Sequence, residues 1–282
     1  MSDYQIINAD CSEHLKFIPD NSIDLIFTSP PYANRRKRNY DSHTPVEYIK
    51  WFIPIAWELK RVLSDTGSFF LNIKAHSYDG ERDLYVMKLV IALKEIVDFK
   101  FVDEYAWVKN PFPAKFHGKF KNGFEPIYHF VKGAVNNITF NPLVCGTSMK
   151  TETLKRINRN RHYHDTMSGL RAVSSINLDE LQLVRPSNVL NINNVSNQFG
   201  GKRKHPATFP VQLADFFIKT FSREGYMVLD PFMGSGTTGI SALNLGRKFI
   251  GIDNKQEYCE LSKDRISKEV KYRTLNLFEI NH

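Results

Sequence analysis

The stretch from Tyr226 to Asp253 constrains the fold of this chain more than any other part of its sequence. It reads YMVLD, PFMGSGTTG, ISALNLG and then KFIGID after one arginine. An apolar run, a Gly-rich turn, a helical pattern and a second apolar run predict a strand, a tight turn, a helix and a second strand. Units of this kind build a parallel sheet that is covered by helices.

The rest of the chain continues this alternation, and SDTG at 64–67 is expected to be the turn that ends one of the helices. The pattern predicts an α/β fold, a doubly wound and mainly parallel sheet with an antiparallel edge pair and helices on both faces. Residues 136–204 break the pattern with polar and basic sequence, which predicts a small insert. The predicted strands are 4–10, 23–30, 67–74, 226–230 and 248–253, with an antiparallel pair at 99–110 and 124–133, and the predicted helices are 11–22, 46–63, 81–96, 209–222, 240–246 and 257–268.

Three glycines in the turn, Gly234, Gly236 and Gly239, satisfy the spacing G-x-G-x-x-G between a predicted strand and a predicted helix. Glycine allows a positive φ and a close ligand approach, and the start of a helix favours an anionic group. Asp253 ends the next predicted strand, where a carboxylate can accept hydrogen bonds from both hydroxyls of a ribose. The pattern predicts a nucleoside cofactor, although for any one glycine a purely structural role in packing stays open.

The glycines alone do not choose between a dinucleotide such as NAD and a nucleoside that carries an amino acid. Dinucleotide folds usually place this fingerprint in their first strand–helix turn, whereas here it comes last. Asp230 and Phe232 precede the glycines. A carboxylate suits an α-ammonium group and an aromatic ring offers an apolar wall, so these residues favour the amino-acid-bearing nucleoside.

The chain is basic, with a formal net charge of +8. The excess positive charge is grouped in three segments that read as loops. Such groups are typical of proteins that bind nucleic-acid phosphates, although a single basic run is more often a solvated surface. The predicted DNA-binding residues are Arg35, Arg36, Lys37, Arg38, Lys150, Lys155, Arg156, Arg159, Arg161, Lys202, Arg203 and Lys204.

Composition weighs against several other classes of protein. With 42% hydrophobic and 24% charged residues, and no apolar run near the roughly 20 residues that span a bilayer, a folded protein outside the membrane is expected. The start MSDYQIINADC lacks the layout of a secretion signal, so a cytoplasmic location is expected. The three cysteines form no C-x-x-C pair, so neither a disulfide nor a metal site is expected.

Two motifs together carry a resemblance to a known family. TSPPY, from Thr28 to Tyr32, follows the apolar run IDLIF, and DPFMGSGTT occupies residues 230–238. With these motifs the chain resembles, over nearly its full length, the permuted (beta) class of S-adenosylmethionine-dependent DNA amino-methyltransferases. In that class the catalytic motif precedes the cofactor motif, as it does here.

The resemblance implies a role for each part of the chain. Residues 1–135 would form the catalytic half of the methyltransferase domain, 136–204 the target recognition insert and 205–282 the half that binds S-adenosylmethionine. Double-stranded DNA is the implied substrate and a cognate restriction endonuclease a possible partner, with no membrane involved. The chain is expected to be a monomer or a homodimer.

The resemblance also implies the cofactor contacts. Asp10 in NADC resembles the family's acidic residue on the adenine side of the cofactor. The segment from His205 to Ile218 resembles the one that closes over the methionine end, although Phe209 stands where a lysine is common. The predicted cofactor-binding residues are Asp10, Cys11, Thr28, Phe209, Pro210, Asp230, Pro231, Phe232, Gly234, Ser235, Gly236, Thr237 and Asp253.

The tetrapeptide Ser29, Pro30, Pro31 and Tyr32 has the groups that amino methylation needs. The amino nitrogen of cytosine or adenine is a poor nucleophile because its lone pair is delocalised into the ring. Ser29 Oγ and the Pro30 carbonyl can accept hydrogen bonds from its two N–H groups, which orients the lone pair and disperses the developing positive charge. Pro30 and Pro31 stiffen the turn, and Tyr32 offers a ring for a flipped base. The predicted transfer is direct, without a covalent enzyme intermediate.

Ser29 bears on which base is methylated. In the family that the chain resembles, serine at this position is typical of cytosine-N4 enzymes, and aspartate or asparagine of adenine-N6 enzymes. The predicted function is therefore a sequence-specific cytosine-N4 DNA methyltransferase of a restriction-modification system, with adenine N6 as the alternative. Transfer to cytosine C5 is disfavoured because no cysteine follows a proline. More distant alternatives are an NAD-dependent oxidoreductase, a catalytically silent DNA-binding module and a methyltransferase that acts on RNA.

Overall fold

The computed structural model describes residues 3–33, 43–78, 80–109, 118, 120–148, 183–193 and 209–280. The chain forms two compact units, one of Met1–Phe140 with Asn188–His282 and one of Asn141–Ser187.

The first unit is built on an eight-stranded sheet with the order β1-β12-β11-β2-β3-β7-β6-β10. Neighbouring strands are parallel except around β7, which is antiparallel to both β3 and β6. The predicted mainly parallel α/β sheet with an antiparallel pair is confirmed, and β10 lies outside that pair as a further parallel strand. The strands are β1 (Tyr4–Asn8), β2 (Ile23–Thr28), β3 (Leu63–Asn72), β6 (Lys100–Val108), β7 (Phe124–Val131), β10 (Val189–Asn191), β11 (Met227–Asp230) and β12 (Lys248–Asp253).

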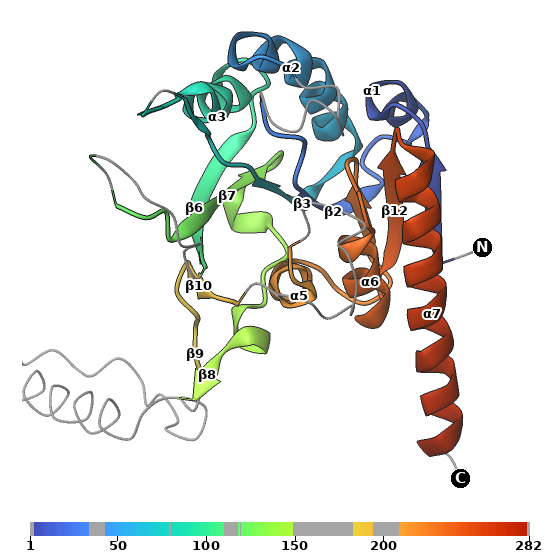
Figure 1. Cartoon of the computed structure of the whole chain (residues 1–282). Coiled ribbons are helices and arrows are strands. Elements are labelled where there is room, and N and C mark those ends of the chain that lie inside the picture. Colours follow the sequence, from blue (N-terminus) through green and yellow to red (C-terminus); the bar gives the residue numbers. More distant parts are fainter. Residues whose placement is uncertain are drawn as a thin grey trace, which may run out of the picture. The chain divides into compact units, whose positions relative to one another are not determined.

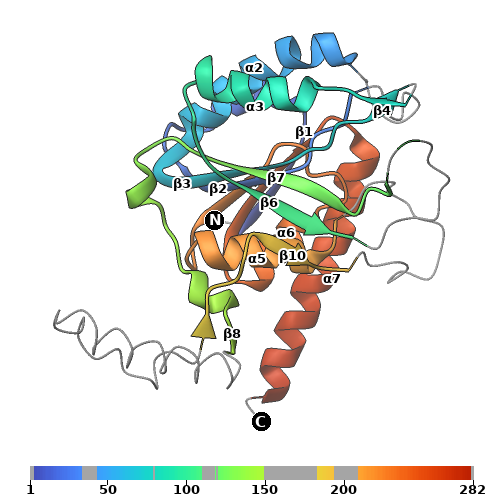
Figure 2. The ribbon, with the colours of Figure 1, turned by 90° about the vertical axis from the view of Figure 1, so that its left-hand side faces the viewer.

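Helices cover both faces of this sheet, as the two views in Figure 1 and Figure 2 show. On one face lie α1 (Cys11–His14), α2 (Pro45–Val62) and α3 (Tyr85–Glu95), and on the other lie α5 (Val211–Phe221), α6 (Thr237–Asn244) and α7 (Gln256–Ile280). Among the described residues, no helix has the length and apolar character that crossing a bilayer requires.

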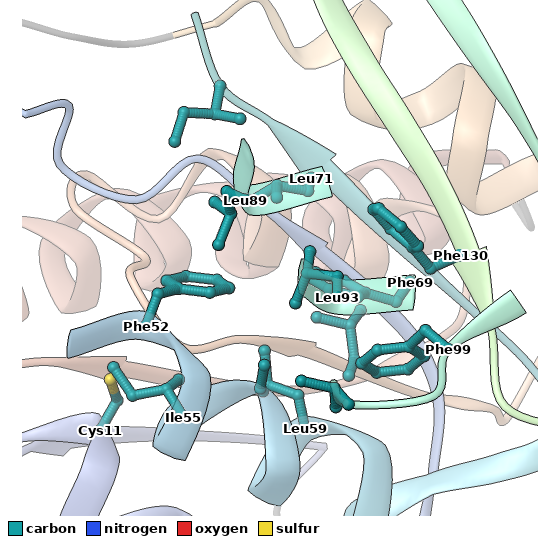
Figure 3. Packing of buried hydrophobic residues seen from close by; sticks show 14 of the residues in the cluster. Cys11, Phe52, Ile55, Leu59, Phe69, Leu71, Leu89, Leu93, Phe99 and Phe130 are labelled. Carbon is teal, nitrogen blue, oxygen red and sulfur yellow. The ribbon is translucent and has the colours of Figure 1, made fainter. Parts of the chain in front are cut away.

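Strand β2, at the centre of the sheet, is mostly apolar and buried because both faces are covered. In β2, Leu25 and Phe27 belong to the core beneath α5 and α6, whereas Ile26 belongs to the core beneath α2 and α3. Figure 3 shows the second of these cores, in which Phe52 of α2 and Phe69 of β3 are buried. Alternate side chains of one strand therefore hold the two helical layers.

The end of α2 differs from the prediction. SDTG, expected as a turn, belongs to β3, because Leu63 already pairs with Ile23 of β2. A Cβ on Gly67 would lie 2.9 Å from the Asp24 carbonyl oxygen. The glycine therefore permits a close approach of two strands instead of ending a helix.

Two other predicted helices are shorter in the structure. The helix expected at 11–22 is α1 followed by a 3₁₀ turn, Leu15–Phe17. Arg61 of α2 donates to the Leu15 carbonyl at 2.7 Å and to the Ile18 carbonyl at 2.9 Å, which takes up acceptors that a longer helix would use. The helix expected at 81–96 begins only at Tyr85, whose N–H donates to Asp83 Oδ1 at 2.7 Å. The residues before it form the hairpin β4 (Ser77–Tyr78) and β5 (Glu81–Arg82).

The second unit is narrower than the predicted insert, 136–204. Residues up to Phe140 belong to the first unit, where the Thr139 N–H donates to the Thr66 carbonyl at 3.0 Å. At the other end β10 is part of the main sheet. Within the second unit a 3₁₀ turn, Pro142–Cys145, precedes the antiparallel pair β8 (Thr147–Ser148) and β9 (Leu183–Val184).

A buried histidine in β7 makes stability depend on pH. His129 is 1% exposed, its Nε2 lies 3.0 Å from Ser68 Oγ, and its Nδ1 has no partner among the described residues. Burial lowers its pKa to about 3 in the folded chain, against about 6.5 in the unfolded chain. Between these values only the unfolded chain binds the extra proton, so this histidine removes stability as the pH falls through 6.5 towards 3.

We expect His129→Gln to reduce that loss. Between pH 7.5 and pH 4.5 the variant's free energy of unfolding should fall less than that of the wild type, by on the order of 2 kcal/mol. Urea unfolding at the two pH values measures the difference. An equal pH dependence in His129→Gln and the wild type would contradict the assignment.

Candidate active site

Two turns leave the sheet side by side at its centre. After β2 the chain passes through α2 to β3, whereas after β11 it passes through α6 to β12, on the opposite side in the strand order. Open α/β sheets bind ligands at such a switch point, beyond the carboxyl ends of the strands. The catalytic turn, residues 29–32, and the cofactor turn, residues 231–236, both start there.

The cofactor turn depends on two glycines with positive φ, 49° at Gly234 and 75° at Gly236. The Gly234 N–H donates to Asp253 Oδ2 at 3.0 Å. From α7, Ser262 Oγ donates to the Gly234 carbonyl at 2.7 Å, and Arg265 donates to the Ser235 carbonyl. The predicted residues of this turn are therefore brought together, and α7 holds two of its carbonyl groups in place.

Gly239 has a different role, in packing. A Cβ at this position would lie 2.5 Å from Cε1 of Phe249 in β12. The third glycine of the motif therefore lets α6 lie close to the sheet, which is the structural role left open for a single glycine.

The neighbouring strand ends bring Asp253, Asp10 and Cys11 together. Parallel pairing places Asn8 of β1 opposite Asp253 of β12, and the Ala9 N–H donates to the Asp253 carbonyl at 3.1 Å. Asp253 is 8% exposed, burial raises the pKa of its carboxyl group, and its Oδ1 accepts from the Lys255 N–H at 2.9 Å. Asp10 is exposed and caps α1, and burial raises the pKa of the Cys11 thiol.

The catalytic turn is braced by two tyrosines that the sequence patterns did not single out. Tyr48 Oη of α2 donates to the Pro31 carbonyl at 2.9 Å. Tyr85 Oη of α3 accepts from the Ala33 N–H at 3.3 Å, and the two tyrosine rings lie 5.0 Å apart. Both lie on buried helix faces, so their helical spacing with other core residues was the available signal. The brace fixes the backbone on either side of Tyr32.

Within the braced turn, the residues that carry the two predicted acceptors differ in exposure. Ser29 and Tyr32 are half-buried, whereas Pro30 is buried. No described residue donates a hydrogen bond to Ser29 Oγ or to the Pro30 carbonyl, while the Pro31 carbonyl is occupied by Tyr48. The turn therefore offers two neighbouring acceptors.

A hydrogen bond from Thr28 to Asp230 joins the residue before the catalytic turn to the residue before the cofactor turn. The Asp230 carboxylate is 2% exposed and accepts hydrogen bonds from Thr28, Phe232 and Thr238. Burial raises its pKa to about 6. Thr238 is a further residue that the sequence patterns did not single out.

Aromatic side chains line the start of the cofactor turn. The half-buried Phe232 ring lies 5.7 Å from Trp51 and 6.4 Å from Phe52, both of α2. Phe209 meets Phe27 of β2 edge to face at 5.1 Å, directly before Thr28. The other predicted cofactor residues here, Pro210, Pro231, Ser235 and Thr237, are buried.

The predicted DNA-binding residues, Arg35 to Arg38, Lys150 to Arg161 and Lys202 to Lys204, all lie outside the described residues. Their role stays a prediction. Trp107 and Lys109, at the end of β6, have side chains of kinds that can also contact DNA. Trp107 is 1% exposed and its Nε1 donates to the Ile192 carbonyl at 2.8 Å, while Lys109 Nζ lies 2.6 Å from Glu125 Oε2. The tryptophan is therefore part of the core.

Comparison with known proteins agrees with this site. The N6/N4 DNA methylase family model matches residues 23–264. The type II methyltransferase M.PvuII of Proteus hauseri is 28% identical over 274 residues, which cover 91% of this chain and 81% of that protein. YhdJ of Escherichia coli strain K12, a DNA adenine methyltransferase, is 29% identical over 279 residues, which cover 98% of this chain and 86% of that protein.

Solved structures show the same fold. The PvuII DNA methyltransferase (cytosine-N4-specific) superposes with a TM-score of 0.69 at 24% identity, covering 95% of this chain and 92% of that chain. The M1.HpyAVI complex with S-adenosylmethionine superposes with a TM-score of 0.58 at 24% identity, covering 93% and 98%. The choice of S-adenosylmethionine over a dinucleotide is confirmed. Because the family model extends from the start of β2 into α7, and so includes both turns, the chain belongs to the N6/N4 DNA methylases and is an S-adenosylmethionine-dependent DNA methyltransferase.

Proposed function

We propose that this enzyme methylates the exocyclic N4 amino group of a cytosine flipped out of double-stranded DNA. The observation that carries the proposal is Ser29, which stands at the first position of the braced Ser-Pro-Pro-Tyr turn. Its Oγ and the Pro30 carbonyl are acceptors for the two amino N–H groups, since Tyr48 already occupies the Pro31 carbonyl. The resemblance to the cytosine-N4-specific PvuII enzyme supports the same base.

The turn would activate the amino group by position and charge. Two hydrogen bonds hold the nitrogen so that its lone pair points out of the base plane, and they stabilise the positive charge that grows as the N–C bond forms. Bound S-adenosylmethionine supplies an electrophilic methyl group, whose bond to sulfur breaks in the same step. The methylated nitrogen then loses one proton to solvent water, and no side chain becomes covalently attached.

Chain residues around the switch point would bind the cofactor. In this proposal the turn from Gly234 to Gly236 lies against its methionine part and Asp253 accepts from the ribose hydroxyls. Asp10 and Cys11 would lie on the adenine side. The Phe232 ring, held against Trp51 and Phe52, would be an apolar wall.

Adenine N6 is the second candidate, and the similarity to YhdJ favours it. Adenine also presents two amino N–H groups, so the acceptor pair alone fits both bases. In either case the basic segments would bind phosphates on both sides of the target. The likeness to a type II methyltransferase supports a cognate restriction endonuclease as a partner. The proposed location is the cytoplasm.

A nucleoside analysis tests the base directly. PCR-amplified bacterial genomic DNA, which carries no modified bases, is incubated with the enzyme and S-adenosylmethionine, digested and analysed by mass spectrometry. We expect N4-methylcytosine as the product, with no incorporation when S-adenosylhomocysteine replaces the donor. N6-methyladenine as the main product would contradict the cytosine assignment. A parallel reaction on duplex RNA of mixed sequence should give no methylated nucleoside.

A further inference from the structure

Asp230 accepts hydrogen bonds from three different parts of the chain. Its Oδ1 lies 2.7 Å from Thr28 Oγ1 at the end of β2 and 3.1 Å from the Phe232 nitrogen in the cofactor turn. Its Oδ2 lies 2.6 Å from Thr238 Oγ1 in the first turn of α6. Thr28 and Thr238 are both 0% exposed. The carboxylate is thus the point at which the catalytic turn, the cofactor turn and α6 meet.

These surroundings differ from those of a carboxylate that binds an α-ammonium group of a ligand. An ammonium group must reach the carboxylate, yet Asp230 is 2% exposed. Its two oxygens already accept three protein donors in charge-assisted hydrogen bonds, whereas each oxygen of the more exposed Asp253 accepts one backbone N–H. All three partners donate an N–H or O–H hydrogen to Asp230, and an ionised carboxylate, which only accepts, suits such partners.

The backbone pairing of the two central strands stops short of the site. Val228 and Leu229 of β11 pair with Leu25 and Ile26 of β2, and this ladder does not reach Thr28. Beyond the ladder, the Thr28–Asp230 hydrogen bond connects the two strands. Thr28 directly precedes Ser29, so this contact determines where the Ser29 acceptor lies relative to the cofactor turn.

We propose that Asp230 is a positioning residue, which holds the methyl-accepting turn in line with the methyl-donating turn through Thr28 and Thr238. Methyl transfer requires the nitrogen, carbon and sulfur atoms in one line, and a misplacement of about 1 Å can cost on the order of 100-fold in rate. The inference rests on methyl transfer to DNA, and it is independent of which base accepts the methyl group.

Thr28→Val tests the link with little change in side-chain volume. At saturating S-adenosylmethionine, we expect the variant to incorporate tritiated methyl groups into amplified genomic DNA at least about tenfold more slowly than the wild type. Its dissociation constant for S-adenosylmethionine, measured by calorimetry, should stay within about threefold. Thr28→Ser keeps the hydroxyl group and should restore most of the rate. Because the assay counts methyl groups on any base, a failure of the cytosine proposal would leave this result readable.

Asp230→Asn and the double variant that combines it with Thr28→Val complete the test. If Asp230 acts through Thr28, the double variant should be no slower than Asp230→Asn alone. Thr238→Val removes the anchor in α6, should show the same loss of rate with retained cofactor affinity, and serves in place of Thr28→Val should that variant not fold. A wild-type rate in folded Thr28→Val, or losses that multiply in the double variant, would overturn the proposal.

Ser222→Ala is the matched control. Ser222 is a buried hydroxyl that accepts a charge-assisted hydrogen bond from Arg247 Nε at 3.1 Å. It precedes the amino end of β11, whereas Thr28 and Asp230 are the last residues of β2 and β11. Its loss should lower the melting temperature but leave both the rate of methyl transfer and the cofactor affinity at wild-type values. A rate loss equal to that of Thr28→Val would show that the Thr28 effect is only structural, and would overturn the proposal.

Discussion

Tyr32→Ala is expected to lower the rate of methyl transfer at saturating S-adenosylmethionine by about 5- to 150-fold, because stacking of a base on an aromatic ring contributes about 1 to 3 kcal/mol. The surrounding structure makes the effect specific to the ring. Tyr48 holds the carbonyl of the preceding residue and Tyr85 holds the N–H of the following one. Removing the ring should therefore leave the backbone of the turn in place.

The measurement compares the transfer rate with the affinity for S-adenosylmethionine. Tyr32→Ala should bind the cofactor within about threefold of the wild type, since its ring is proposed to contact the base and not the cofactor. Tyr32→Phe keeps the ring and should retain most of the rate. A normal rate in Tyr32→Ala would remove this residue from the mechanism, and a parallel loss of cofactor affinity would show that the whole site had been disturbed.

Asp253→Ala is expected to have the opposite effect, a loss of cofactor affinity of about 5- to 150-fold, corresponding to roughly 1 to 3 kcal/mol for charge-assisted hydrogen bonds. Two contributions add in this variant. The carboxylate would no longer accept from the ribose hydroxyls, and the Gly234 N–H would lose its acceptor in the cofactor turn. Titration calorimetry with S-adenosylmethionine measures the loss.

Asp24→Asn is the matched control for this variant. Asp24 Oδ2 accepts a hydrogen bond from the Met227 N–H at 2.8 Å, much as Asp253 accepts from Gly234, but it lies near the amino ends of β2 and β11. Asp24→Asn should therefore bind the cofactor like the wild type. An unchanged affinity in Asp253→Ala would mean that the ribose assignment is wrong.

Local patterns predicted most of the elements because they depend on neighbours in the sequence. The Gly-rich turn, the helix after it and the following strand were all readable from glycine spacing and apolar periodicity. Helix ends were predicted less well. SDTG has turn-forming residues, but it became part of β3 because pairing with β2 outweighed their local preference. The short α1 is a further case, since a contact distant in sequence, from Arg61 to the Leu15 carbonyl, decided its boundary. Before α3, a local pairing, the hairpin of β4 and β5, took the place of the first helical turn.

The candidate site, too, was predicted from local sequence only in part. Glycines, prolines and the residues that follow the apolar runs marked both turns. Helical spacing could place Tyr48 and Tyr85 on buried helix faces, but an aromatic residue there is ordinarily part of the core, so nothing in the local sequence marked their hydroxyl groups for the site. Their hydroxyl groups matter only because α2 and α3 place them under the catalytic turn.

By itself, the sequence determined an α/β sheet with a nucleoside-binding turn and an acceptor-rich turn, because strand, helix and turn preferences act over a few residues. Only the tertiary structure decided that these turns meet and that Asp230 joins them. The hydrogen bond from Thr28 to Asp230 spans 202 positions of the chain. The physical reason is the strand order, which places β2 beside β11, and no pattern within either segment carries that order.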